Sequence, residues 1–528
     1  MKKYALGWVA TVQIAILWQA PLTGQIGPLD SGRSRPLRSP IADTGKTKPD
    51  PSRQSELRKR HRPTGDWGGP ACAPADELKA LVDDYLATPH PAFPGLGSTV
   101  PGVSVSIYNE GCGTFTYAAG LANVEQGREL SPAALMRIAS MTKVVVAAVA
   151  LKLDEAGVFG PLGLDTPVAQ LLTPAQIAAL STGADPAAPR CPGQTWLRNR
   201  DTLQWEFKTY SCPDLSRVTL RHLMISNHGM YDFLNEVALP NGRNQFWDGV
   251  FFDLYKVLGL DPAPPVNGET GFEYLASFGL KHNDDAVIGG NLRFRDLESS
   301  VGNTGMQLLG VILEHRTGQT LGKLVQTLVT QPLGIEHMPM SVNADRRGLE
   351  ADDYEIFTGD ADVEGVYPLT DLNGHAAVNT LSLGKPANQT LAGGAAGLLS
   401  TPRSYAVFLR KFVEGGLLGP RGQAALESSY LYLPDYSLPE VTAYMGFGLG
   451  KDEFRGWPGL PDHDFLAHIG RLPGAQCFNG VIIRIDGTVG PIHGALCMNT
   501  LLEAYPSGQL LWLNMIDRIL IPENFGGQ

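Results

Sequence analysis

The chain is organised around the stretch Arg137-Ile-Ala-Ser-Met-Thr-Lys-Val-Val-Val-Ala-Ala-Val-Ala-Leu-Lys-Leu153. Its apolar run from Val144 to Leu151 predicts a buried helix that follows a turn. Ser140 and Lys143 stand at the helix start, at the i, i+3 spacing that places two side chains on one face. The free N–H groups and positive dipole end there favour negative charge developing on Ser140. Burial lowers a lysine pKa until the neutral amine can accept a proton, so the stretch predicts a serine nucleophile with its own base.

Ser-x-x-Lys is a short pattern that also arises by chance, and the chain contains a second copy from Ser382 to Lys385. Pro386 follows that copy in a stretch rich in Gly, Pro and Asn, so we expect a loop with no helix to align the pair. The copy at Ser140 differs because it opens an apolar helix. Its chemical meaning therefore depends on what the rest of the chain carries.

The composition is that of a globular protein, with 43% hydrophobic and 18% charged residues over 528 residues. A net charge of -11 argues against nucleic acid as a partner. Residues 1–24 resemble a secretory signal, because Met-Lys-Lys precedes a mostly apolar stretch from Tyr4 to Trp18. A membrane anchor is the alternative, although this stretch is short for a span and we expect no stable membrane span. Residues 25–70 are rich in Pro, Arg, Ser and Gly, which predicts a disordered linker or propeptide.

The chain has 6 cysteines, an even number that fits an oxidising compartment, secreted or periplasmic. Two strands, 477–485 and 490–497, around a turn at Asp486-Gly487-Thr488 would place Cys477 opposite Cys497. Cys191 and Cys212 bracket a polar insertion and would close it, which leaves Cys72 with Cys112. Free thiols in a cytosolic protein are the alternative. No Cys-x-x-Cys occurs, and we expect neither a metal site nor an organic cofactor.

Both ends of the folded region show a helix and antiparallel strands. Residues 76–86 predict an amphipathic helix, and residues 102–108 and 114–119 predict a hairpin with period-2 alternation. The 477–497 hairpin precedes an amphipathic helix over 507–520. The middle is mainly helical in pattern, with helices expected over 215–225, 245–258, 305–317 and 321–329 and loops over 184–214 and 339–390. We therefore expect one α/β domain, residues 71–150 and 395–523, and a helical domain with loop insertions, residues 151–394.

Further motifs follow the Ser140 helix in order: Val218-Thr-Leu-Arg-His-Leu-Met-Ile-Ser-Asn-His-Gly-Met-Tyr-Asp232, Gly302-Asn-Thr-Gly-Met-Gln-Leu-Leu-Gly-Val-Ile-Leu-Glu314, Gly393-Gly-Ala-Ala-Gly-Leu-Leu-Ser-Thr-Pro402 and His468-Ile-Gly470. In order and spacing they resemble the motifs of the serine β-lactamase-like hydrolases, which include class C β-lactamases, DD-peptidases and β-lactamase-fold carboxylesterases. The resemblance covers about residues 75 to 520. It implies an antiparallel sheet flanked by helices, an α/β (α+β) transpeptidase-like fold, joined to a mainly helical domain.

The resemblance also implies roles for individual residues. Ser140 would form the acyl-enzyme and Lys143 would accept its proton. Asn303 would bind substrate or orient Lys143, and His468 would line the cleft, unless it is a structural histidine at a strand end. The backbone N–H groups of Ser140 and of Arg471, just after Gly470, would form the oxyanion hole.

One position departs from the family pattern, whose second motif is Tyr-x-Asn with a tyrosine that shares the general-base role. Here the corresponding residue is Val301, which cannot transfer a proton. Lys143 could act alone, as a lone lysine does in other serine–lysine enzymes. Tyr231 could take the place of the missing tyrosine, because it follows the turn in the Val218–Asp232 segment. Otherwise the protein binds without catalysing.

The sequence thus predicts a secreted or periplasmic serine hydrolase that acts on an ester or amide through an acyl-serine. It would be an esterase, or resemble a DD-peptidase or β-lactamase, with a small-molecule or peptide acyl substrate. The alternative is a catalytically impaired binding protein on the same fold. The acyl group and the oligomeric state leave no signal in the sequence.

Overall fold

The computed structural model describes residues 67–68, 72–88, 100–123, 126–182, 191–198, 205–232, 272, 275–276, 279–284, 287–289, 302–340, 353–356, 380–384, 393–433, 437–456, 461–472, 475–485, 491–499 and 508–520. The expected signal peptide, nearly all of the expected linker, the expected helix over 245–258 and Val301 lie outside these residues. None of the helices within these ranges is both long and apolar enough to cross a membrane.

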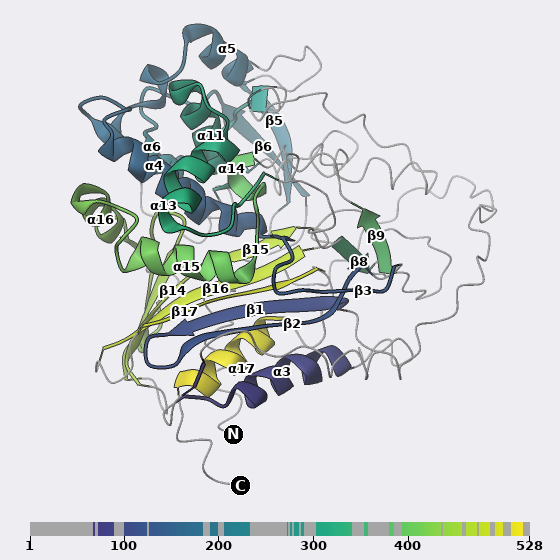
Figure 1. Cartoon of the computed structure of the whole chain (residues 1–528). Helices are drawn as coiled ribbons and strands as arrows, with labels where there is room; N and C mark the ends of the chain where they lie inside the picture. The colour runs from purple at the N-terminus through teal and green to yellow at the C-terminus, as the bar shows by residue number, and fades with distance from the viewer. Residues whose placement is uncertain are drawn as a thin grey trace, which may run out of the picture.

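An antiparallel sheet forms the base of the molecule, and strands from both ends of the chain meet at its centre (Figure 1). The strand β1 (Gly102–Asn109) pairs on one side with β2 (Gly113–Asn123) and on the other with β17 (Ile492–Met498), which pairs with β16 (Ala475–Arg484). The expected hairpins are therefore neighbours in one sheet. This confirms the predicted fold class.

The sheet continues beyond these strands in the order β11-β12-β13-β14-β16-β17-β1-β2-β3, with β15 also paired to β16. The remaining strands are β3 (Arg128–Glu129), β11 (Leu431–Tyr432), β12 (Val441–Met445), β13 (Gly450–Phe454), β14 (His463–Ala467) and β15 (Ile469–Leu472).

Helices cover both faces of the sheet. On one face lie α3 (Ala75–Ala87) and α17 (Gly508–Leu520), the expected terminal helices, which pack with the sheet around Trp512 and other apolar side chains (Figure 1). On the other face lies α15 (Pro402–Val413), followed by α16 (Pro420–Glu427). The helical region sits beyond α15, on the same side of the sheet (Figure 1).

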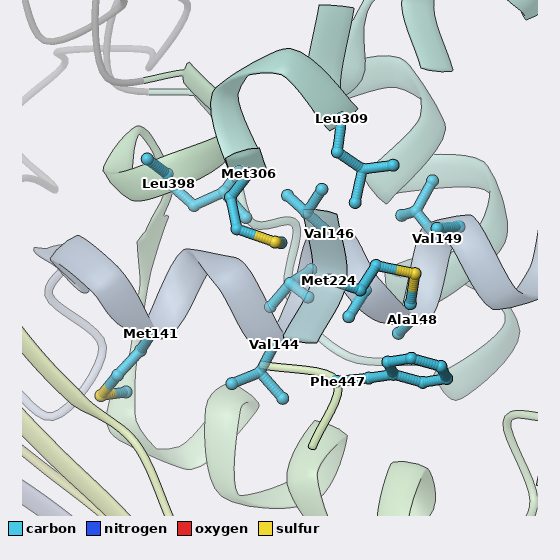
Figure 2. Packing of buried hydrophobic residues seen from close by; sticks show 14 of the residues in the cluster. Met141, Val144, Val146, Ala148, Val149, Met224, Met306, Leu309, Leu398 and Phe447 are labelled. Atoms are coloured by element: carbon cyan, nitrogen blue, oxygen red, sulfur yellow. The ribbon is translucent and has the colours of Figure 1, made fainter. Parts of the chain in front are cut away.

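The helix α4 (Thr142–Glu155) is the expected helix after Ser140, and it is buried on nearly all sides. A helix that is apolar all round must be enclosed by other elements. Figure 2 shows Met224 of α6, Met306 and Leu309 of α11, and Phe447 packed around α4. These neighbours are α6 (Leu220–Ile225), α11 (Asn303–Thr317) and the turn after β12. Beside them lie α5 (Pro174–Thr182), α12 (Leu321–Val325) with its π-helical continuation Gln326–Thr330, α13 (Gln331–Leu333), and α14 (Gly393–Ala396).

Part of the region expected to be a loop is a small sheet. The strands β5 (Gly193–Arg198) and β6 (Trp205–Ser211) form a hairpin, and β6 also pairs with β7 (His282–Asn283). The expected helix over 215–225 begins only at Leu220, because Thr219 and His222 form a capping box at that point. Ser382, which begins the second Ser-x-x-Lys, lies in the strand β9 (Thr380–Gly384), paired with β8 (Asp353–Ile356), and not in a helix. Lys385 lies outside the described residues.

Three disulfide bonds join the expected cysteine pairs, Cys72–Cys112, Cys191–Cys212 and Cys477–Cys497. Cys477 and Cys497 lie directly opposite each other on β16 and β17, as the hairpin geometry predicts.

Candidate active site

Ser140 lies in a single 3-10 turn, Ala139–Met141, that leads directly into α4. Ala139 has a φ of 46°, a left-handed conformation that costs energy for a residue with a Cβ. Such strain persists only where surrounding contacts hold it, and it concentrates at functional sites. Here Ile138 N–H donates to the Leu398 carbonyl at 3.2 Å, which ties the entry of the turn to the segment after α14. The turn thus carries Ser140 in a fixed, strained backbone.

Lys143 faces Ser140 from the first turn of α4. Its Nζ lies 2.7 Å from Ser140 Oγ and 3.2 Å from the carbonyl oxygen of Ala395. Burial lowers the pKa of Lys143 to about 7, against a smaller opposing effect of the Asp232 carboxylate. A substantial fraction of Lys143 is therefore a neutral amine at neutral pH, within reach of the Ser140 proton.

Asn303 begins α11 and is fully buried. Its Nδ2 donates to Asp232 Oδ2 at 2.7 Å. A carboxylate only accepts, so this bond fixes the orientation of the amide, with the Oδ1 acceptor on the other side. Asp232 thus accepts a hydrogen bond from Asn303 and, through its charge, raises the pKa of Lys143. Sequence reasoning did not assign Asp232 a role, although it ends the Val218–Asp232 segment.

His468 lies between β14 and β15 and is buried. Burial, together with the charge of Lys143, lowers the pKa of His468 to about 3, although a hydrogen bond to the Gly448 backbone opposes the shift. The imidazole is therefore neutral at neutral pH. Its Nδ1 is buried and has no hydrogen-bond partner among the described residues.

The strand β15 runs beside the Ser140 turn and carries Gly470 and Arg471. A Cβ on Gly470 would clash with the Ile138 carbonyl oxygen. Only glycine therefore lets β15 lie this close to the Ser140 turn. Arg471 directly follows Gly470 on this strand. An oxyanion hole formed by the backbone N–H groups of Ser140 and Arg471 stays a prediction.

The hydroxyl of Tyr231 is directed to the small sheet and is not hydrogen-bonded to Ser140, so its assignment as a candidate base gains no support and stays a prediction. Its hydroxyl donates toward the Thr209 carbonyl at 3.4 Å and Asn283 Oδ1 at 3.3 Å, on β6 and β7. Its backbone N–H bonds the Lys281 carbonyl. Successive side chains of an extended segment point to opposite sides, so Asp232 meets Asn303 while Tyr231 turns toward the small sheet. Among the described residues no tyrosine hydroxyl is bonded to Ser140, and no group of His, Cys, Asp and Glu suited to a metal occurs.

Known proteins share both sequence and fold with this chain. The profile of the family described as Beta-lactamase matches residues 58–269 and 299–500. The esterase EstB of Burkholderia gladioli is 28% identical over 218 residues, which span 41% of this chain and 41% of that esterase. The alignment thus reaches less than half the length of that curated relative.

Two solved structures show the same fold at low identity. One is D-amino acid amidase from Ochrobactrum anthropi SV3 complexed with L-phenylalanine amide, with TM-score 0.53, 18% identity and coverage of 85% of this chain and 98% of that one. The other is a D-stereospecific amidohydrolase from Streptomyces sp., with TM-score 0.54, 19% identity and coverage of 84% and 98%. Together with the family match over most of its length, the fold shows that this chain belongs to the β-lactamase family.

Proposed function

We propose that this protein is a secreted serine hydrolase that cleaves an ester or amide through an acyl-serine at Ser140. The observation that carries the proposal is the 2.7 Å contact between Lys143 Nζ and Ser140 Oγ in a buried setting. The names of the relatives, an esterase and amidases, favour esters and amides as the substrate class. The disulfides and the signal-like N-terminus support secretion.

In this mechanism the neutral Lys143 takes the Ser140 proton as Oγ attacks the acyl carbon. The backbone N–H groups of Ser140 and Arg471 stabilise the oxyanion. The Lys143 ammonium then protonates the leaving oxygen or nitrogen as the bond to the acyl carbon breaks. Water attacks the acyl-serine as Lys143 takes one of its protons. The Lys143 ammonium then protonates Ser140 Oγ as the bond between Oγ and the acyl carbon breaks, which releases the acid and regenerates Ser140 and the neutral lysine. Lys143 thus serves alone where family members share the role with a tyrosine.

The alternative is a binding protein on the same fold, which Val301 favours because that residue cannot transfer a proton. Intact-mass labelling with a fluorophosphonate and, in parallel, a penicillin separates the two. We expect a stoichiometric adduct on the wild type and none on Ser140→Ala. A folded wild type that reacts with neither reagent supports the binding protein instead.

A further inference from the structure

The strands β14 and β15 are one strand interrupted at His468. Both pair with β16 in the same register, with Leu466 opposite Val481 before the break and Ile469 opposite Phe478 after it. At the break the backbone N–H of His468 donates to Oδ1 of Asn479 on β16, at 3.1 Å. A side chain thus accepts from the backbone at the residue that begins the His468-Ile-Gly470 motif.

The same asparagine leads to the Ser140 turn. Asn479 Nδ2 donates to the hydroxyl of Tyr405 on α15 at 3.3 Å, and that hydroxyl donates to the carbonyl of Met141 at 3.0 Å. Met141 directly follows Ser140. Each group uses its matching role, since the amide oxygen accepts, the amide nitrogen donates and the hydroxyl does both. The bonds therefore form a continuous chain from the His468 backbone to the nucleophile turn.

The chain is sealed from water. Asn479 is 1% exposed, and Tyr405 and Met141 are fully buried. A buried polar group that loses its partner has no water to replace it, so breaking any link leaves an unpaired group. The buried hydrogen bonds thus favour one relative placement of α15, β16 and the Ser140 turn.

We propose that Tyr405 and Asn479 are positioning residues that hold the Ser140 turn in register with the β15 strand. The inference rests on the proposed function, whose oxyanion hole takes one N–H from each of these elements, from Ser140 and from Arg471. Oxyanion-hole donors act only at hydrogen-bond distance from the developing charge, so a small drift between turn and strand weakens both bonds. The two side chains end on backbone atoms, and they act through those backbones.

The variant Tyr405→Phe removes the hydroxyl and keeps the ring, which packs edge-on against Phe408 with centroids 5.5 Å apart. We expect kcat for an activated ester to fall about 10- to 100-fold, since misplacement of a catalytic group by about 1 Å costs up to 10²-fold. KM and the pH midpoint should stay near wild type, because the side chain touches neither substrate nor Lys143. Asn479→Ala breaks the neighbouring link and should lower kcat in the same way, so the test does not depend on one variant.

Tyr117→Phe is a matched control. Tyr117 is a buried tyrosine whose hydroxyl donates to Asp83 Oδ1 at 2.7 Å, in the cluster between the sheet and α3. Losing this hydroxyl costs a hydrogen bond without touching the Ser140 turn, so kcat should stay at the wild-type level. If kcat falls equally in Tyr405→Phe and Tyr117→Phe, the loss in Tyr405→Phe comes from general destabilisation of the fold. That result would overturn the proposal.

Amide hydrogen exchange of residues 138–142 tests positioning without activity. We expect faster exchange there in Tyr405→Phe and Asn479→Ala, and no change in Tyr117→Phe. Wild-type kcat and wild-type exchange in both of the former variants would overturn the proposal. If the wild type neither hydrolyses esters nor reacts with a fluorophosphonate, the proposed function fails, and the exchange rates alone decide whether these residues hold the turn.

Discussion

At the scale of single residues, the burial of Lys143 is the feature on which the chemistry depends. Its pKa of about 7 lies well below that of a lysine in water, mainly because burial penalises the ammonium form. Below pH 7 the group is protonated and cannot accept a proton, and above it the neutral base dominates. We therefore expect the rate of Ser140 acylation to rise with pH through a midpoint near 7 and then level off, as measured by stopped-flow with an activated ester.

The variant Lys143→Arg isolates this base. Arginine remains protonated at every accessible pH, so it retains the charge and loses the base. We expect acylation to fall by about 10²–10⁴-fold, the usual contribution of a general base. An arginine variant with wild-type rates and the same pH midpoint would show that another group takes the proton.

Asp232 provides a second residue-scale test. Its carboxylate raises the pKa of Lys143 against the larger effect of burial. Asp232→Asn removes the charge but keeps an oxygen that can accept from Asn303, so the pH profile should move to lower pH. Asp165→Asn is the control, because Asp165 is an exposed carboxylate paired with Arg221. An unchanged pH midpoint of acylation in Asp232→Asn would show that the Asp232 carboxylate does not influence the pKa of Lys143.

The sequence predicts some of these residues and not others for a physical reason. Ser140 and Lys143 share one helical turn, so their spacing is enough to predict the contact. Asp232, Tyr405 and Asn479 meet the site from segments far apart in the chain, and only the packed fold brings them there. Tyr231 and Asp232 are adjacent in sequence, and the choice between them depends on which way each side chain points.

At the scale of elements, the approach of β15 to the Ser140 turn requires glycine at position 470. In Gly470→Ala the added Cβ would clash with the Ile138 carbonyl and push β15 away from the Ser140 turn. We expect the free energy of unfolding to fall by about 1–3 kcal/mol, which is typical of overpacking. We also expect the acylation rate to fall by more than the loss of folded protein accounts for. Gly450→Ala is the control, since its Cβ would find its nearest neighbour at 3.6 Å, an ordinary contact. Urea denaturation and acylation rates of both variants check this, and a fully active Gly470→Ala would contradict it.

Elements with regular apolar patterns were predictable, and those set by distant partners were not. The run from Val144 to Leu151 and the alternation over 102–108 each specify their element locally. The strands β5 and β6 lie in a polar segment with prolines, and β6 takes its second partner from residues 282–283, far along the chain. No local period reports such pairing, which explains why this region was expected to be a loop.

At the scale of the whole molecule, a second buried lysine affects stability. Burial lowers the pKa of Lys281 from 10.5 to about 7. The unfolded chain therefore binds more protons than the folded protein between these values, so stability should rise with pH across this window. Lys281→Met should raise the free energy of unfolding at pH 7 by a few kcal/mol, since one pKa unit corresponds to about 1.4 kcal/mol.

Urea denaturation at pH 7 and pH 9.5 measures this, with the difference between wild type and variant expected to shrink at the higher pH. Lys323→Met, at an exposed lysine, controls for the loss of surface charge. A destabilisation of Lys281→Met that is equal at both values of pH would show that the contacts of the ammonium with the Gly279 carbonyl and the Tyr210 ring outweigh its burial.

The fold class could be predicted from the sequence, because the motifs occur in order and the strands near both ends of the chain show clear apolar–polar alternation. The placement of β17 between β1 and β16 could not, because strand order depends on contacts between opposite ends of the chain. The cysteine pairs were predictable where a hairpin fixes the register, as at Cys477 and Cys497. Local pattern therefore predicts the parts of the sheet, and long-range packing decides how they join.

The most direct test of the central claim is to trap the acyl-enzyme. The protein is mixed with p-nitrophenyl acetate, quenched in acid at early times, and analysed by intact mass and peptide mapping. We predict one acetyl group on the peptide that contains Ser140, absent from Ser140→Ala and strongly reduced in Lys143→Arg. Release of p-nitrophenol at the same rate from wild type and Ser140→Ala, with no acetylated Ser140, would contradict the assignment of Ser140 as the nucleophile.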